Sequence, residues 1–206
     1  GRMFTPMNRE RIMESALQIG ADYVFMVDDD MVFKQDIFER LYRHKVDVVA
    51  ALAFTRNPPH LPVMYQSRKG WDEIIHKDFF ITEWIKNYPK NKLVEVDAVG
   101  FGCVLIDTKC VKNMKPPYFM CSSGTGEDIF FCLKAGEAGA RIFCDTSTKV
   151  GHLSNPMIID EEMAEKHNDR ELNDKLYGPY KRYGVYEVGN FPEVKMNGKE
   201  EVVLAR

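Results

Sequence analysis

Three consecutive aspartates, Asp28, Asp29 and Asp30, follow directly on the apolar residues 23–27. A short, uniformly apolar run is typical of a buried strand, and a strand that ends in several carboxylates cannot bury them without a partner. Because adjacent negative charges repel one another, the arrangement costs stability unless a cation binds there. Carboxylate oxygens are the ligands that Mg²⁺ and Mn²⁺ prefer. The junction therefore predicts a metal site at the end of a strand, with a solvated acidic turn as the structural alternative.

Helical and extended patterns alternate in the first part of the chain. Residues 8–19 carry apolar side chains at helical spacing and end at Gly20, and residues 36–42 predict a second helix. The apolar runs 23–27 and 46–52 predict buried strands. Such short alternation of helix and strand is typical of a parallel α/β sheet.

The pattern changes over residues 54–92, which hold several prolines, both tryptophans and short alternating runs. This segment predicts antiparallel strands and loops over one end of the sheet, a usual place for substrate contacts. The remaining expected elements are strands at 93–96, 103–106 and 141–144, a helix at 126–138, a charged helix at 160–176, and a polar tail at 180–206 with edge strands.

These elements predict an α/β fold: a mixed sheet flanked by helices, with a small antiparallel subsheet and a C-terminal helical and polar tail. Residues 1–155 are expected to form the catalytic domain, and residues 156–206 a helix and tail that pack on it. A chain of 206 residues with 45% hydrophobic residues is large enough for such a core.

Charge and cysteine content exclude several classes of protein. The net charge is −3 and the basic residues are scattered, so no nucleic-acid surface is expected. No apolar run approaches the roughly 20 residues that a membrane helix needs, so no membrane span is expected. The cysteines are odd in number and lack zinc-type pairing, which predicts reduced thiols in a cytoplasmic protein.

A second motif combines an acid with two closely spaced glycines, Asp97, Gly100 and Gly102. Glycines at the mouth of a strand allow the backbone to pass close to a ligand or to adopt a positive φ. A simple bulge is the structural alternative. Asp97 could equally be a hydrogen-bonded turn residue.

A third motif places Glu127 and Asp128 after a glycine-rich stretch, at the first turn of a predicted helix. Acidic residues there are favoured by capping and by the helix dipole, so a purely structural role competes with a chemical one. Asp128 stands next to residues of an apolar helix face, and a carboxylate beside such a face can act as a general base. His152, after the last predicted strand, is a candidate Mn²⁺ ligand or a structural histidine.

In this order, the motifs resemble those of glycosyltransferases of the GT-A fold, which is Rossmann-like. The resemblance covers about residues 5–153 and is closest to the large family 2 group and its phage- and virus-like branches. The aspartate run resembles the Asp-x-Asp motif of that fold. This implies that Asp28 contacts the metal or the nucleotide ribose and that Asp30 binds the metal, while Asp29 lies at the donor or only orients the turn.

The same resemblance assigns the other motifs. Asp97, Gly100 and Gly102 are similar to the stretch that faces the donor sugar and the acceptor. Glu127 and Asp128 resemble the pair that opens the catalytic helix, with Asp128 as the usual base of inverting members. The resemblance also implies that His152 completes the metal site, with Asp28 and Asp30, and that Arg9 lies near the donor.

The implied activity is the metal-dependent transfer of a sugar from a UDP- or GDP-type nucleotide donor to a hydroxyl of a glycan, lipid-linked or protein acceptor, with Mn²⁺ or Mg²⁺ as the cofactor. Inversion with Asp128 as the base follows from the resemblance, and a retaining route through Glu127 or Asp97 stays open. Tyr65, Trp71 and Trp84 are candidate acceptor-side residues, or they pack in a satellite core.

Two other functions stay open at this point. One is a sugar-1-phosphate nucleotidyltransferase, which would normally show a glycine-rich, basic phosphate loop near its N-terminus. The other is a catalytically silent module that binds a sugar or a metal. Members of the resembled family usually begin with a strand–helix–strand that holds the nucleobase, and we expect the catalytic domain of this sequence to lack that part.

Overall fold

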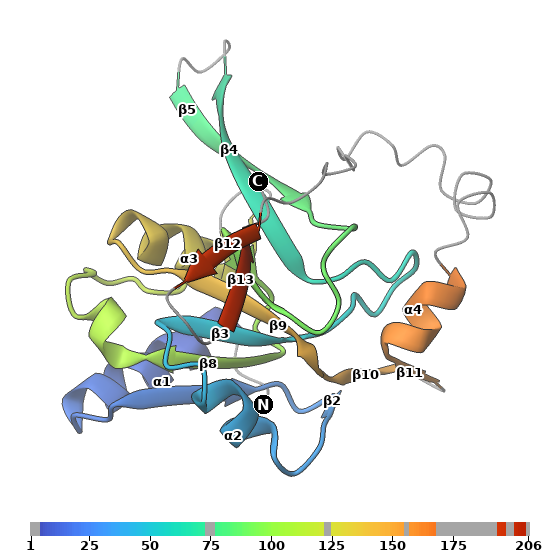
Figure 1. Ribbon diagram of the computed structural model, residues 1–206. Helices are drawn as coiled ribbons and strands as arrows, with labels where there is room; N and C mark the ends of the chain where they lie inside the picture. Colours follow the sequence, from blue (N-terminus) through green and yellow to red (C-terminus); the bar gives the residue numbers. More distant parts are fainter. Residues whose placement is uncertain are drawn as a thin grey trace.

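A computed structural model describes residues 5–72, 77–121, 125–154, 157–167, 193–196 and 200–204. The centre of the molecule is a seven-stranded mixed sheet (Figure 1). In spatial order its strands are β1 (Tyr23–Val27), β8 (Cys103–Asp107), β3 (Val48–Leu52), β9 (Ile142–Lys149), β6 (Leu93–Val96), β13 (Glu200–Leu204) and β12 (Glu193–Met196).

The expectation of a mixed α/β sheet is confirmed, but the simple parallel order is wrong in one respect. β3 and β9 are parallel neighbours, as are β6 and β13. β1 and β3 run in the same direction without touching, because β8 lies between them and is antiparallel to both. The first four residues of β8 are fully buried, so a uniformly apolar strand occupies this central position.

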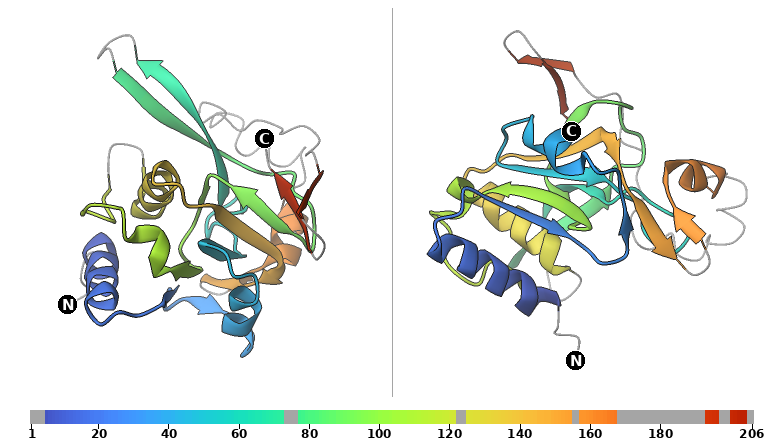
Figure 2. Two further views of the ribbon diagram at one scale, coloured as in Figure 1. Left: turned by 60° about the vertical axis from the view of Figure 1, so that its left-hand side comes forward. Right: turned by 90° about the horizontal axis from the view of Figure 1, so that it is seen from below.

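Helices cover both faces of the sheet (Figure 2). α1 (Thr5–Gln18) and α3 (Glu127–Glu137) lie on one face, and α2 (Ile37–Tyr42) lies on the other. Alternate residues of β3 divide accordingly. Ala50 packs with the core of α1 and α3, whereas Val49 packs with the core of α2, as the two-residue period of a strand requires.

Two three-stranded sheets extend the central one. In the first, β10 (Gly151–Ser154) lies between β11 (Met157–Ile159) and β2 (Met31–Val32). In the second, β4 (Met64–Asp72) pairs with β5 (Lys77–Trp84) and with β7 (Ala98–Val99). The β4–β5 hairpin projects from the body of the molecule (Figure 1), and it confirms the expected antiparallel subsheet.

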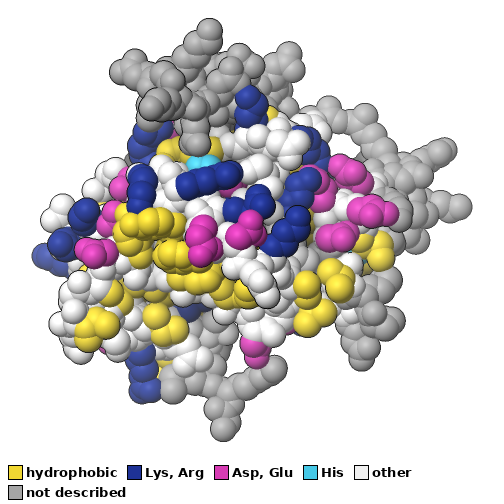
Figure 3. Space-filling view, turned by 60° about the horizontal axis from the view of Figure 1, so that its bottom comes forward, with side chains coloured by type: hydrophobic (Ala, Val, Ile, Leu, Met, Phe, Trp, Pro, Cys, Tyr) yellow, Lys and Arg dark blue, Asp and Glu magenta, His cyan; other side chains and the backbone are white. Residues whose placement is uncertain are grey.

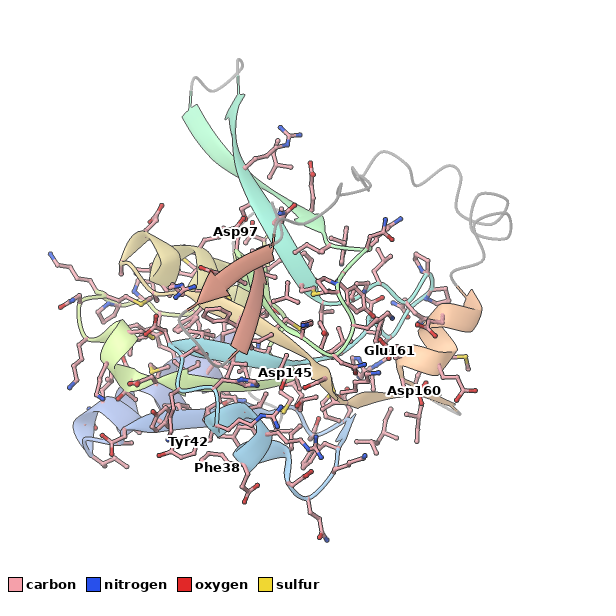
Figure 4. The ribbon with its side chains drawn as sticks, in the orientation of Figure 1. Phe38, Tyr42, Asp97, Asp145, Asp160 and Glu161 are labelled. Atoms are coloured by element: carbon pink, nitrogen blue, oxygen red, sulfur yellow. The ribbon has the colours of Figure 1, made fainter. Side chains whose placement is uncertain are left out.

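Aromatic rings line the outer side of α2. Phe38 stacks on Tyr42 with ring centroids 5.5 Å apart, and the two rings also meet Phe25 and Tyr23 of β1 edge-on. Hydrophobic side chains gather across this side of the molecule among basic and acidic ones (Figure 3). Phe38 and Tyr42, both partly exposed, are labelled in Figure 4.

The structure describes part of the C-terminal segment. α4 (Glu161–His167) forms the start of the predicted charged helix, and its continuation to residue 176 lies outside the described part. Of the two strands in the tail, β12 lies at the edge of the main sheet as predicted, whereas β13 lies between β12 and β6. Among the described helices, none combines the length and apolarity needed to traverse a bilayer.

The cysteines are free thiols. Cys103 and Cys144 lie in β8 and β9 and are buried, where they pack as small apolar residues. Burial, with the nearby charge of Asp28, raises the pKa of Cys103 to about 12. A thiol with so high a pKa is a poor nucleophile at neutral pH.

Candidate active site

Arg9 of α1 joins three of the sequence motifs. Its side chain is only 7% exposed, and its two terminal nitrogens donate to Asp28 Oδ1 and to Glu127 Oε1, each at 2.8 Å. The nitrogen bonded to Asp28 also donates to the carbonyl oxygen of Phe101 at 3.3 Å. One guanidinium therefore holds the aspartate turn, the glycine motif and the first turn of α3 together.

The aspartate turn is fixed by backbone hydrogen bonds on both sides. Asp28 N donates to Gly102 O at 2.9 Å, which ties the end of β1 to the start of β8. Leu153 N donates to Asp30 O at 2.8 Å, and Met31 pairs with His152 between β2 and β10. Asp30 and His152, which are far apart in sequence, are therefore neighbours by strand register.

The side chains of Asp30 and His152 meet at this register. His152 Nε2 lies 3.3 Å from Asp30 Oδ2. His152 Nδ1 lies 3.1 Å from the carbonyl oxygen of Phe54, so Nδ1 carries the proton and Nε2 keeps its lone pair in the neutral ring. Arg56 is bonded to Asp30 Oδ2 and lies 3.2 Å from His152 Nε2, and it neutralises the carboxylate.

This pair fits a divalent metal ion in the chemistry of its donor atoms. Asp30 Oδ1 is buried and has no hydrogen-bond partner among the described residues, while His152 Nε2 presents a lone pair 3.3 Å from the other carboxylate oxygen, Oδ2. Within the described ranges, no three acidic, histidine or cysteine side chains converge as a metal cluster. A two-residue ligand set suits an ion that takes its other ligands from substrate phosphates and water.

Asp28, predicted as a third metal ligand, accepts a hydrogen bond from Arg9 through Oδ1, and its role at the metal stays a prediction. Asp29 is exposed on the turn. Its role at the donor stays a prediction, as does that of Asp28.

Asp128 lies in the first turn of α3 with its carboxylate folded back on the helix. Ile129 N donates to Asp128 Oδ1 at 2.8 Å. A Cβ at Gly126 would come within 2.8 Å of the same oxygen, so the glycine leaves room for the carboxylate. Burial raises the pKa of Asp128 and outweighs the Ile129 hydrogen bond, which lowers it. A carboxylate whose pKa is raised is a better proton acceptor than a solvated one.

Two predicted acceptor-side residues come together near Asp128, and both pack in the main core: Tyr65 is buried there and Trp84 lies against it, as the packing alternative foresaw. The rings of Tyr65 and Trp84 lie 5.6 Å apart. Burial raises the pKa of Tyr65, and the charge of Asp128 raises it further, which places the two groups in one neighbourhood. A hydrogen bond from the Trp84 side chain to Tyr65 lowers the pKa of Tyr65 in part. Ser67 Oγ is buried without a hydrogen-bond partner among the described residues.

Asp97 does not join the other acidic residues in the contacts described. Its Oδ2 accepts a hydrogen bond from Ser67 N at 2.6 Å, which anchors the start of the β4–β5 hairpin (Figure 4). This is the turn role that the sequence left open, and the donor role stays a prediction. Trp71 pairs with Asp78 in the hairpin, and its side chain lies outside the described residues.

The two glycines of the second motif serve close packing. A Cβ at Gly100 would lie 2.9 Å from Val63 Cβ, and one at Gly102 would lie 2.3 Å from Met31 Cε. Neither glycine has a positive φ, so that expectation is wrong. The close backbone approach is real, but it is made to Val63 and Met31 within the protein.

Sequence reasoning missed Arg56. It lies in the segment after β3, and only the fold brings it to Asp30 and His152. The one signal in the sequence is a basic residue shortly after a predicted strand, in a segment already expected to cover one end of the sheet.

Comparison with known proteins supports the fold. No protein-family model and no curated protein matches the chain. Among 36 matching chains of solved structures is A197 from STIV, with 20% sequence identity and a TM-score of 0.56. The match covers 79% of this chain and 74% of that chain. At this identity the similarity shows a shared α/β fold and leaves function to the site itself.

Proposed function

We propose that the protein is a metal-dependent glycosyltransferase of the GT-A type, which moves a sugar from a nucleotide-diphosphate donor to an acceptor hydroxyl. The observation that carries the proposal is the pairing of one buried guanidinium with both acidic motifs. Arg9 bonds Asp28 and Glu127, whose neighbours in sequence are the aspartate turn that carries Asp30 and the helix residue Asp128. A metal ligand and a candidate base are thereby held around one cation.

Asp30 and His152 are the residues that would hold Mn²⁺ or Mg²⁺. When bound, the ion would neutralise the charge that develops on the nucleoside diphosphate as it leaves. The contact of His152 Nδ1 with Phe54 O fixes the tautomer that leaves a lone pair on Nε2. Asp30 Oδ1 has no hydrogen-bond partner among the described residues. Both ligands belong to backbone that is bonded between β2 and β10, so their separation is set before a ligand arrives.

Asp128 would accept the proton of the acceptor hydroxyl as that oxygen attacks the anomeric carbon. Its burial favours this role, because a raised pKa brings a carboxylate closer to the pH at which it works. Glu127 is bonded to Arg9 and to the thiol of Cys121, so it serves as a positioning residue at the start of α3. An attack opposite to the leaving group would invert the anomeric centre.

The acceptor would lie against Tyr65 and Trp84. Sugar rings pack on aromatic faces, and Ser67 Oγ, which has no hydrogen-bond partner among the described residues, would offer a hydrogen bond to a hydroxyl group. Tyr65 is itself near Asp128. The acceptor hydroxyl would therefore be bound beside the base.

The test is release of nucleoside diphosphate from a panel of UDP- and GDP-sugars, with and without Mn²⁺. We expect Asp128→Asn to reduce transfer by about 10²–10⁴-fold, the usual contribution of a general base, and to leave Mn²⁺ binding within about two-fold of the unmodified protein. Glu137→Gln, on the exposed end of the same helix, is the matched control. If the unmodified protein releases no nucleoside diphosphate from any donor, the proposal fails.

A second candidate is a nucleotide- or sugar-binding module without transferase activity. The pairing of Arg56 with Asp30 favours it, because the carboxylate already has a cation. Donor binding measured by calorimetry, without turnover in the assay above, would support this candidate over the enzyme.

A further inference from the structure

Arg56 holds the place between Asp30 and His152 that a divalent metal ion would take. Its terminal nitrogen is bonded to Asp30 Oδ2 and lies 3.2 Å from the lone pair of His152 Nε2. A guanidinium carries only donors, so it meets the acceptor atoms of both residues as a metal would. The metal and Arg56 cannot contact the same two atoms at once.

The pair is built so that the arginine can leave. The Arg56 side chain is 48% exposed, and exposed ion pairs contribute little to stability. Two hydrogen bonds join the ends of the loop that carries Arg56. Thr55 N donates to Leu61 O and Leu61 N donates to Thr55 Oγ1, each at 2.9 Å. Rotation of the side chain alone would therefore free the ligands while the backbone stays in place.

One acceptor atom is left over when Arg56 is bound. Asp30 Oδ1 is buried and without a partner among the described residues, so the guanidinium satisfies the site only in part. A doubly charged ion would attract the carboxylate more strongly than the singly charged guanidinium does. The site thus favours exchange of the arginine for a metal ion over permanent occupation by the arginine.

We propose that Arg56 is a built-in competitor of the metal: it binds Asp30 and His152 in the metal-free protein and is displaced when a divalent cation enters. The inference rests on the metal site of the proposed function. The arginine keeps the half-buried carboxylate neutralised until the metal arrives, and it lowers the apparent affinity for the metal by the fraction of time it holds the ligands.

The first experiment measures Mn²⁺ affinity by electron paramagnetic resonance or calorimetry, without donor and without turnover. Arg56→Gln removes the competitor, and we expect Mn²⁺ to bind about five-fold more tightly, the factor that corresponds to an exposed pair of moderate strength. Arg56→Lys keeps a cation in the loop and should stay closer to the unmodified protein. Arg68→Gln, which removes an exposed arginine paired with Glu83, is the matched control and should change nothing.

The second experiment uses the unmodified protein and follows modification of Arg56 by phenylglyoxal with mass spectrometry. We expect Mn²⁺ to raise the modification rate at Arg56 at least two-fold, because the guanidinium leaves its carboxylate, and to leave the rate at Arg68 unchanged. The same measurement on Asp30→Asn, which weakens both the ion pair and the metal site, should show no response to Mn²⁺.

The outcomes separate the inference from the function on which it rests. Equal Mn²⁺ affinity of Arg56→Gln and the unmodified protein, or weaker affinity of the variant, overturns the competitor role and leaves the metal site intact. Binding by Arg56→Gln alone shows that Arg56 blocks the site without being displaced, which overturns the exchange and contradicts metal dependence of the natural protein. No binding by any variant overturns the metal site, and the competitor role with it.

Discussion

Arg9→Met tests whether the buried guanidinium holds the site together. The change removes both charge-assisted hydrogen bonds and keeps an apolar side chain against the Phe101 ring, whose centroid lies 5.4 Å from the Arg9 guanidinium carbon. The two carboxylates that lose their partner differ in exposure. Glu127 is 16% exposed and Asp28 is 42% exposed, so water can replace the arginine at Asp28 far better than at Glu127.

The expected loss follows from this difference. Breaking a buried ion pair by removing one partner costs about 3–5 kcal/mol, whereas an exposed pair contributes at most about 1 kcal/mol. The Arg9–Glu127 pair is of the buried kind, and the Arg9–Asp28 pair is close to the exposed kind. Because some water reaches Glu127 as well, we expect Arg9→Met to lower the free energy of unfolding by about 3 kcal/mol, at the low end of the buried range.

The assay is urea unfolding at pH 7, followed by circular dichroism, with the midpoint and slope fitted separately. Adding Glu127→Gln to Arg9→Met removes the unpaired charge and should recover about 2 kcal/mol, a coupling typical of residues in direct contact. The free energy of unfolding of Arg9→Lys should lie between those of the unmodified protein and Arg9→Met. The ammonium keeps the positive charge but lacks the fork with which the guanidinium reaches both acids. A loss below about 1 kcal/mol, with coupling below about 0.5 kcal/mol, would refute the shared guanidinium.

The remaining predictions concern the base and the core of the sheet. Gly126→Ala places a Cβ within 2.8 Å of Asp128 Oδ1. The rate of sugar transfer should therefore fall at least about 10-fold, while the free energy of unfolding changes by less than about 1 kcal/mol. An unchanged turnover rate would contradict this packing. Burial raises the pKa of Asp145, but hydrogen bonds from His44, Ser147 and Thr148 lower it to about 2. Because the folded pKa lies below the unfolded value, this stabilisation of about 2 kcal/mol is present above pH 4 and is lost as the pH falls towards 2. Acid unfolding of Asp145→Asn should lack this component, and identical pH profiles would exclude it.

The local pattern of the sequence predicts much of the sheet. The apolar runs predict β1 and β6 at the bounds that the structure has, because a buried strand is a short-range signal. β9 is longer than predicted. The sequence pattern predicts that this strand ends at residue 144, where polar residues begin, yet the strand continues to Lys149. Its polar side chains are satisfied inside the fold, chiefly around Asp145 and His44 (Figure 4).

The candidate site likewise contains residues that the sequence predicts and one that it does not. Asp30, Asp128 and His152 follow from residue types at the ends of predicted elements, since chemistry at such positions is visible in the sequence. Arg56 does not follow, because its role depends on where the loop after β3 lies relative to β10, and only tertiary contacts fix that. The position of β8 between β1 and β3 is hidden for the same reason, as strand pairing depends on partners far along the chain.

The contacts of the candidate site join residues that are far apart in sequence, which affects when the site forms in a newly made chain. Arg9 and Glu127 are 118 positions apart, and Arg56 and His152 are 96 apart. Contacts of such range form after long loops have closed, late in folding. A nascent chain that ends before residue 152 contains every strand up to β9 but only one member of the Asp30–His152 pair. The metal site proposed above would therefore be incomplete until the chain has been made past residue 152.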